Sequence, residues 1–122
     1  MKESFLERAK ENLDAAEMLL ERECFNASAN RAYYAAFHAA LAALFHFGYN
    51  PDIDHKPVQA SFNSFLIHQR KVFPADMKSS LVQMLDVRGE ADYRTGIGRK
   101  KALAQLKQAS QFLQTIFKVI DV

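Results

Sequence analysis

Apolar residues recur every three or four positions along five stretches of the chain, and this spacing predicts five helices. The first stretch covers residues 4–23, where one face carries Phe5, Ala9, Leu13, Ala16 and Leu20. Ser4 and Glu7 have the spacing of a capping box, in which two groups satisfy free backbone N–H groups at a helix start. We therefore expect the first helix to begin at "SFLE".

The second stretch, about residues 26–48, is apolar on nearly all sides, with Asn26 as the expected N-cap and Gly48 as the expected C-cap. A helix that is apolar all round lies in the centre of a bundle. A bundle of this size rarely surrounds one helix completely. We therefore expect a second chain to cover part of this helix and predict a homodimer.

Prolines and glycines divide the rest of the chain into three further helices. They cover about residues 57–70, a segment that follows Pro74 and ends or bends near Gly89, and about residues 98–120. The last helix has the 3-4-3-4-3 spacing of a bundle seam or a dimer interface, at Leu103, Leu106, Ser110, Leu113, Phe117 and Ile120. No stretch alternates with the period of a strand over a useful length. The predicted fold is all-α, an up-and-down bundle of four to five helices in a single domain over residues 1–122.

Charge and cysteine content narrow the setting in which the protein works. The formal net charge of +2 is too small by itself to indicate a nucleic-acid or membrane partner. A single cysteine, Cys24, excludes an intramolecular disulfide and fits a reducing compartment. The first residues lack the apolar core of a signal peptide, and the longest apolar run is too short to span a bilayer. We expect a cytoplasmic protein without a membrane partner.

Three polar residues, Arg31, Tyr34 and His38, interrupt the apolar second helix, and helical geometry places them along one stripe. A guanidinium can hold a phosphate by two parallel hydrogen bonds, and a histidine can act as general acid or base near neutral pH. Arg31 and His38 are therefore candidates for nucleotide binding, or for metal-independent RNA cleavage with the 2′-hydroxyl as nucleophile. Tyr33 or Tyr34 would orient them or stack on a base. The alternative is structural, with Arg31 and His38 as hydrogen-bonded partners in the core.

A second polar cluster lies in "DVRGEADYRTGIGRKK", residues 86–101. Cations at the start of the last helix oppose the helix dipole, and a bound anion would remove the conflict. The alternative is that these side chains point into water, at a penalty of roughly a few tenths of a kcal/mol each. Arg88 and Asp92 can pair only if their helix continues through Gly89. The candidate binding residues here are Arg88, Asp92, Tyr93, Arg94, Arg99, Lys100 and Lys101.

Sequence motifs for metal and cofactor sites are absent. There is no E-x-x-H pair of a di-iron bundle, no H-E-x-x-H and no P-loop. "DIDH", residues 52–55, groups two carboxylates and an imidazole that could bind a divalent ion. A polar loop in which Asp54 caps the next helix explains the same residues, and we favour it. We expect neither a metal nor another cofactor.

Three segments together resemble the HEPN family, the higher-eukaryote and prokaryote nucleotide-binding domain. They are "RAYYAAFHAALAALFHFG", the histidine-containing loop "DIDHK" and "VRGEADY", and with the all-helical plan they cover nearly the whole chain. The resemblance implies a five-helix domain that dimerises. It also implies a genetic or physical link to a small nucleotidyltransferase, often as a toxin–antitoxin pair.

Many members of that family resemble metal-independent ribonucleases, with an arginine and a later histidine separated by four to six residues near the dimer cleft. Arg31 and His38, with six residues between them, have this spacing. Active members usually carry Asn, Asp or His directly after the arginine, whereas Ala32 follows it here, and no histidine follows Arg88. We therefore predict a dimer that binds a nucleotide or RNA phosphate beside a nucleotidyltransferase-type partner. Two alternatives stay open: an active endoribonuclease toxin using Arg31 and His38, and a non-catalytic interaction scaffold.

Overall fold

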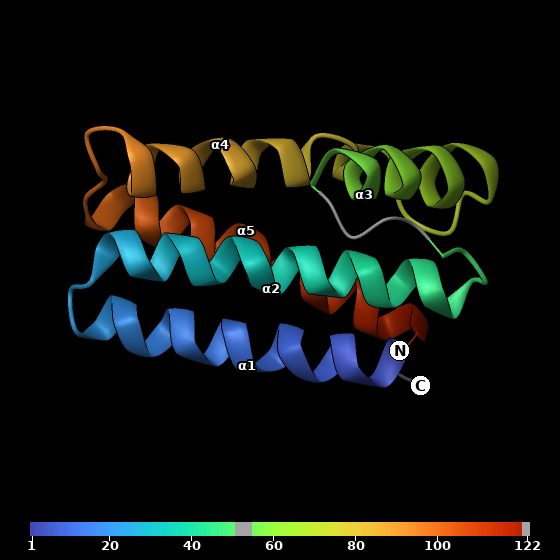
Figure 1. The fold of residues 1–122 in the computed structure, drawn as a ribbon, viewed down its shortest axis with the longest axis horizontal. Helices are drawn as coiled ribbons and strands as arrows, with labels where there is room; N and C mark the ends of the chain where they lie inside the picture. Colours follow the sequence, from blue (N-terminus) through green and yellow to red (C-terminus); the bar gives the residue numbers. More distant parts are fainter. Residues whose placement is uncertain (51–54, 121–122) are drawn as a thin grey trace.

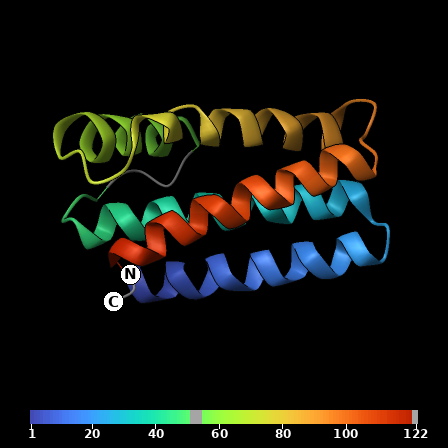
Figure 2. The same ribbon diagram turned by 180° about the vertical axis from the view of Figure 1, so that it is seen from behind.

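The computed structural model describes residues 1–50 and 55–120, and these form an all-α bundle without strands (Figures 1 and 2). The predicted fold class is confirmed. No helix in the described ranges is long and apolar enough to cross a membrane. The helices are α1 (Lys2–Glu21), α2 (Phe25–His46), α3 (His55–Ser61), α4 (Ser80–Tyr93) and α5 (Arg99–Ile120); a π-helix, η1 (Phe62–Gln69), continues α3, and a short 3-10 turn, η2 (Ala75–Met77), precedes α4.

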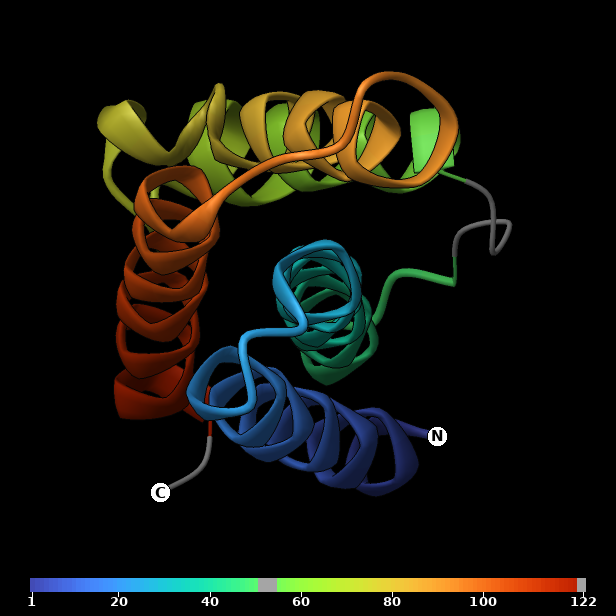
Figure 3. The same ribbon diagram turned by 90° about the vertical axis from the view of Figure 1, so that its left-hand side faces the viewer.

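As its apolar sides predict, α2 is the central helix. It packs against α1, α4 and α5, which surround it on three sides in the end-on view (Figure 3). Helices approach closely when the side chains between them are small. The apolar surface of α2 led us to expect a second chain, but much of it is covered by helices of the same chain. The homodimer therefore stays a prediction. The alanines of α2 that have no exposed surface are Ala29, Ala32, Ala35, Ala36, Ala39, Ala40, Ala42 and Ala43.

The capping box predicted for the first helix is wrong. α1 begins at Lys2 with Met1 as its N-cap residue, and no side chain caps it. A capping box needs its serine at the last non-helical position. Because residues 2–4 are already helical, Ser4 lies inside the first turn and cannot take that role.

α2 differs from expectation at its start and agrees at its end. It begins at Phe25, and no side chain caps it. Asn26 Oδ1 instead accepts a hydrogen bond from the backbone N–H of Ile97 (2.8 Å), which fixes the α4–α5 loop against α2. Gly48 ends the helix as predicted, because its φ of +87° allows the N–H of Tyr49 to close the last turn on an α2 carbonyl.

The buried face of α5 is turned relative to the predicted seam. Leu106, Leu113 and Ile120 of the seam are buried, but Leu103 is 37% exposed. α5 packs against α1, α2 and α4 together, so its buried face is wider than the seam of a two-helix pair. The buried residues of α5 are Ala102, Gln105, Leu106, Ala109, Phe112, Leu113, Ile116 and Ile120.

α4 continues through Gly89 to Tyr93, so the predicted helix end at that position is wrong. A glycine inside a helix costs only about 1 kcal/mol relative to alanine. The missing side chain also leaves room for another group, because a Cβ at position 89 would stand 2.8 Å from Arg94 Nη2. Arg94 folds back there and donates to the backbone oxygen of Asp86 (3.0 Å). The unbroken helix places Arg88 and Asp92 one turn apart on the same face.

Candidate functional site

Arg31 is the centre of a hydrogen-bond network that joins three helices. Its Nη1 donates to Asn12 Oδ1 on α1 (3.1 Å), and its Nε donates to Asn30 Oδ1 on α2 (2.9 Å). Its Nη2 donates to the same oxygen of Asn30. The guanidinium is thereby held in one orientation by two amide oxygens, in a half-buried position.

Asn12 connects the two candidate catalytic residues. Its Nδ2 donates to the backbone oxygen of Arg8 (2.9 Å) and lies 3.3 Å from His38 Nδ1, while its Oδ1 accepts from Arg31. One amide group therefore bridges Arg31 and His38, which lie two turns apart on α2. Sequence reasoning missed Asn12, because a single asparagine in the amphipathic first helix becomes significant only when that helix packs against the second.

The network continues from Asn30 to α4. Asn30 Nδ2 donates to Asp92 Oδ2 (2.7 Å), and Arg88 Nε donates to the same carboxylate oxygen (3.2 Å). Arg88 Nη2 then donates to the hydroxyl of Tyr93 (3.1 Å). The predicted pairing of Arg88 with Asp92 is confirmed, and these side chains are only 15% and 22% exposed.

Tyr34 lies between the guanidinium groups of two helices. Arg31 Cζ is 5.2 Å from the centroid of its ring and Arg88 Cζ is 5.4 Å from it, both within cation–π distance. Tyr33, by contrast, has no exposed surface and lies in the core, where burial raises the pKa of its hydroxyl above its ordinary range. The ring of Tyr34 therefore contacts both arginines of the site.

The network carries more positive than negative charge. Asp92 is the one carboxylate that the described residues contribute to it, and Asp92 is already bound by Arg88 and Asn30. No carboxylate in residues 1–50 and 55–120 forms an ion pair with Arg31. A half-buried cation whose described partners are neutral amides attracts an anion, because nothing in its immediate shell cancels its charge.

His38 is held in its neutral form by its surroundings. Burial lowers the pKa of the imidazole, and so do the charges of Arg8 and Arg31, while a hydrogen bond with the backbone of Tyr34 opposes the shift. The ring stacks on Phe5, with 6.0 Å between the ring centroids. A neutral imidazole beside a guanidinium can accept a proton, as a general base must.

The comparison with known proteins agrees with this architecture. The HEPN domain family matches residues 2–120. This chain belongs to the HEPN domain family. It is similar to "Putative toxin MJ0605" of Methanocaldococcus jannaschii, at 28% identity over 97% of this chain and 87% of the relative. It is also similar to a "UPF0332 protein" of Thermotoga maritima, at 30% identity over 93% of this chain and 86% of the relative.

Acid should destabilise this HEPN domain in part through His38. The pKa of His38 is lowered from its ordinary value of 6.5, so the unfolded chain binds this proton more readily than the folded one. The corresponding stability is therefore present above about pH 6.5 and lost as the pH falls through the folded-state pKa. We expect His38→Gln to flatten the fall in unfolding free energy between about pH 7 and pH 5.

Urea denaturation of wild type and variant at the two pH values measures this effect. His46→Gln is the matched control, because His46 is an exposed histidine at the end of the same helix. With His38 intact, the control should keep the acid-dependent loss of stability. An unchanged pH dependence in His38→Gln would contradict the proposed environment of the imidazole.

The cations at the start of α5 lie apart from the Arg31 network. Arg99 pairs with Glu23 (2.8 Å) and Lys101 with Glu90 (2.7 Å), whereas Lys100 is exposed. Such exposed pairs contribute at most about 1 kcal/mol each. Two of the three charges thus have carboxylate partners in the HEPN domain, which weakens the electrostatic argument for an anion at this helix start.

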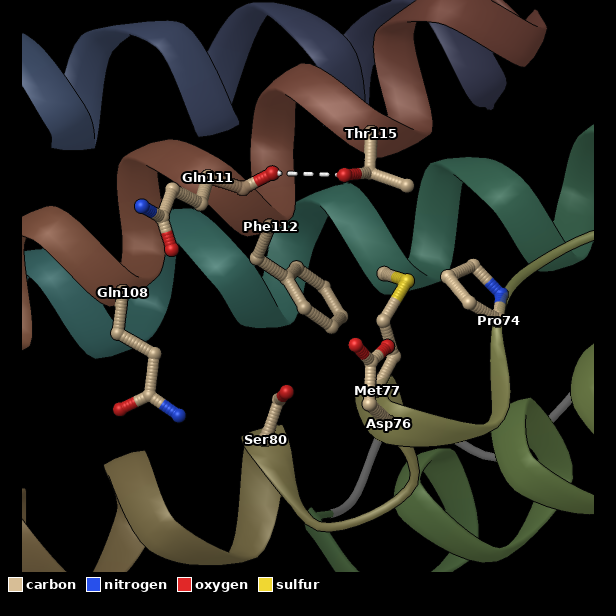
Figure 4. Close-up of a pocket in the computed structure, with 8 residues that line it drawn as sticks. All are labelled: Pro74, Asp76, Met77, Ser80, Gln108, Gln111, Phe112 and Thr115. Carbon is tan, nitrogen blue, oxygen red and sulfur yellow. Dashed lines mark hydrogen bonds between the residues drawn. The ribbon is translucent and has the colours of Figure 1, made fainter.

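A separate cavity of about 280 Å³ lies where η2, the start of α4 and α5 meet (Figure 4). None of the predicted site residues lines it. Thr115 Oγ1 donates to the backbone oxygen of Gln111 (3.0 Å), so this hydroxyl in the cavity wall already has a hydrogen-bond partner within α5. Its lining residues are Pro74, Asp76, Met77, Ser80, Gln108, Gln111, Phe112 and Thr115.

No group of three potential metal ligands occurs among the residues that the structure describes. The metal alternative considered for "DIDH" falls on residues 52–54, which lie outside that part of the chain, and on the side chain of His55, which is not described either. The proposed cap Asp54 lies outside it as well.

Proposed function

We propose that this HEPN-domain protein binds the phosphate of a nucleotide or an RNA strand at the Arg31 network, as part of a toxin–antitoxin module. The observation that carries the proposal is the half-buried guanidinium of Arg31, which no described carboxylate neutralises. The similarity to a protein whose name includes "toxin" supports the biological setting.

The geometry suits a phosphate oxygen. A guanidinium has five N–H donors, and the bonds to Asn12 and Asn30 use three of those of Arg31. One N–H on Nη1 and one on Nη2 therefore form no hydrogen bond with the described residues. Charge-assisted hydrogen bonds of this kind are about twice as strong as neutral ones. Because the two asparagines fix the guanidinium beforehand, little side-chain entropy is lost when an anion binds.

The homodimer and the nucleotidyltransferase-type protein partner expected from the resemblance are part of this proposal. Apolar side chains are exposed on α5, namely Leu103 (37%) and Val119 (39%), and would be covered by a protein partner. Light scattering of the purified protein, alone and mixed with a candidate partner, measures both associations.

Replacing Arg31 by alanine is expected to weaken the binding of a fluorescein-labelled single-stranded RNA by about 10- to 100-fold. Arg31→Lys should also weaken it, because a single ammonium group cannot reproduce the bonds to Asn12 and Asn30 together with two to a phosphate. Fluorescence anisotropy at fixed salt measures the affinity. Fixed salt matters because phosphate contacts are strongly salt-dependent.

Arg99→Ala is the matched control for the Arg31 variants. It removes one guanidinium that pairs with Glu23 outside the network, so it changes the net charge by the same amount. Equal losses in the Arg31 and Arg99 variants would indicate non-specific attraction rather than a site. A loss of stability in Arg31→Ala with unchanged RNA affinity would favour the interaction scaffold, with Arg31 and His38 as structural partners.

Metal-independent RNA cleavage is the second candidate function. It is favoured by the Asn12 amide, which joins Arg31 to a neutral His38. In that reaction the RNA 2′-hydroxyl attacks the adjacent phosphorus while His38 accepts its proton. The P–O5′ bond breaks, and the leaving 5′-oxygen takes a proton from water. The products are a 2′,3′-cyclic phosphate and a 5′-hydroxyl, and His38 returns its proton to the solvent. RNA cleavage in excess EDTA is its test.

A further inference from the structure

We infer that the surface around Tyr93 is a subsite for a nucleobase, which stacks on the tyrosine ring while the attached phosphate faces Arg88 and Arg94. This inference rests on the proposed function and specifies its ligand. The ligand is a nucleobase carrying a phosphate, as a free nucleotide or as one unit of a single-stranded RNA.

The ring of Tyr93 is both open to solvent and fixed in position. It is 74% exposed, the largest exposed fraction among the large apolar and aromatic side chains of the described residues. Its hydroxyl accepts a hydrogen bond from Arg88 Nη2 (3.1 Å), and Arg88 Cζ lies 5.4 Å from its ring centroid. A ring held at one end by an arginine that is itself mostly buried is ordered before any ligand binds.

A cavity of about 390 Å³ lies beside this ring. Val82, Leu85 and Gly89 give it an apolar wall, while Asp86 and Arg94 line its polar side. Ligand sites commonly have volumes of about 300–1,000 Å³ and combine apolar walls with a few polar groups. The cavity is therefore large enough for one base and its sugar.

The charged groups of the cavity favour a phosphate next to the base. Arg94 pairs with Asp86 at 3.3 Å, but the two side chains are 54% and 74% exposed. An exposed ion pair is weak, so Arg94 can exchange this carboxylate for a phosphate at little cost. Arg88 also lines the cavity, so two guanidinium groups lie within reach of one nucleotide.

Arg88 connects this cavity to the proposed phosphate site. Its guanidinium contacts the rings of both Tyr93 and Tyr34, and Tyr34 in turn contacts Arg31. A strand whose base stacks on Tyr93 therefore follows a continuous row of arginine and tyrosine side chains toward Arg31. Alternating aromatic and cationic groups are typical of surfaces that bind single-stranded nucleic acid.

The chain offers a direct optical test, because it contains no tryptophan. Tyr93→Trp keeps a stacking ring and makes it the single indole fluorophore. We expect AMP and hexa-adenylate to quench its emission in a saturable way, whereas ribose 5-phosphate, which has no base, should not. Similar affinities for the two ligands would identify a free nucleotide as the occupant, and much tighter binding of hexa-adenylate would identify a strand.

Tyr93→Ala is expected to weaken hexa-adenylate binding by about 5- to 150-fold, the usual effect of losing one stacked base. Tyr93→Phe keeps the ring and should stay within a few-fold of wild type. Tyr49→Trp is the matched control, because Tyr49 lies beyond the far end of α2 and stacks on Phe65. Its emission should not respond to AMP.

Absence of quenching in Tyr93→Trp, together with wild-type affinity in Tyr93→Ala, would overturn the subsite. The subsite would likewise be overturned if Tyr93→Ala lowered the mass measured by light scattering but left hexa-adenylate affinity unchanged, since the surface would then be a protein interface. Combining these data with the Arg31 variants separates the two proposals. Base-dependent quenching that persists in Tyr93→Trp with Arg31→Ala supports the subsite alone, whereas loss of RNA binding only in Arg31→Ala supports the phosphate site alone.

Discussion

Replacing Gln105 by glutamate is expected to lower the free energy of unfolding at neutral pH by about 3–5 kcal/mol. Gln105 is 1% exposed, and its Nε2 donates to the backbone oxygens of Met84 (2.9 Å) and Ala29 (3.3 Å). One amide thereby joins α5 to α4 and α2. A buried carboxylate would present a negative oxygen to these two carbonyl oxygens.

Urea denaturation of Gln105→Glu at about pH 7 and pH 5 tests this expectation. Protonation restores a donor and removes the charge, so the variant should recover part of its stability as the pH falls. Gln105→Leu is the matched control. It loses both hydrogen bonds but also removes Oε1, which has no hydrogen-bond partner among the described residues, and should cost only about 1–2 kcal/mol. Equal losses in the two variants at neutral pH would show that charge is not the cause.

Under the second candidate function, His38→Ala is expected to slow RNA cleavage in excess EDTA by about 100- to 10,000-fold, the usual contribution of a general base. The substrate is a single-stranded RNA, incubated with purified wild type and variant. The rate and the 2′,3′-cyclic phosphate product are measured. Asn12→Ala should also lower the rate, because Asn12 holds both Arg31 and His38.

His46→Gln is the control for the cleavage assay, since it removes an exposed histidine of α2 outside the network. Circular dichroism of each variant shows whether it remains folded. Cleavage lost in folded His38→Ala but kept in His46→Gln would make His38 a catalytic residue. Absence of cleavage even in wild type would exclude the ribonuclease and leave phosphate binding or scaffolding.

Hydrophobic spacing in the sequence was sufficient to predict the helices and the central place of α2. Spacing decides these features because a helix repeats every 3.6 residues, so its apolar face is set locally. The end of α2 was also local, since Gly48 adopts a backbone conformation that costs other residues energy. The start of α2 was not. Asn26 has the chemistry of a cap, but its side chain is used by the α4–α5 loop.

The stripe of Arg31, Tyr34 and His38 also followed from helix geometry, as did the pairing of Arg88 with Asp92 once α4 continued through Gly89. The two asparagines that join these residues could not be predicted from helix geometry. Asn12 and Asn30 are ordinary polar residues until α1 and α4 pack on either side of α2. Asn12 is 19 positions from its partner Arg31, and Asn30 is 62 positions from its partner Asp92. Contacts across such separations depend on the rotation and offset of whole helices, which only the packed core fixes. The sequence thus determined which residues could form a site, and the tertiary structure decided which of them share one.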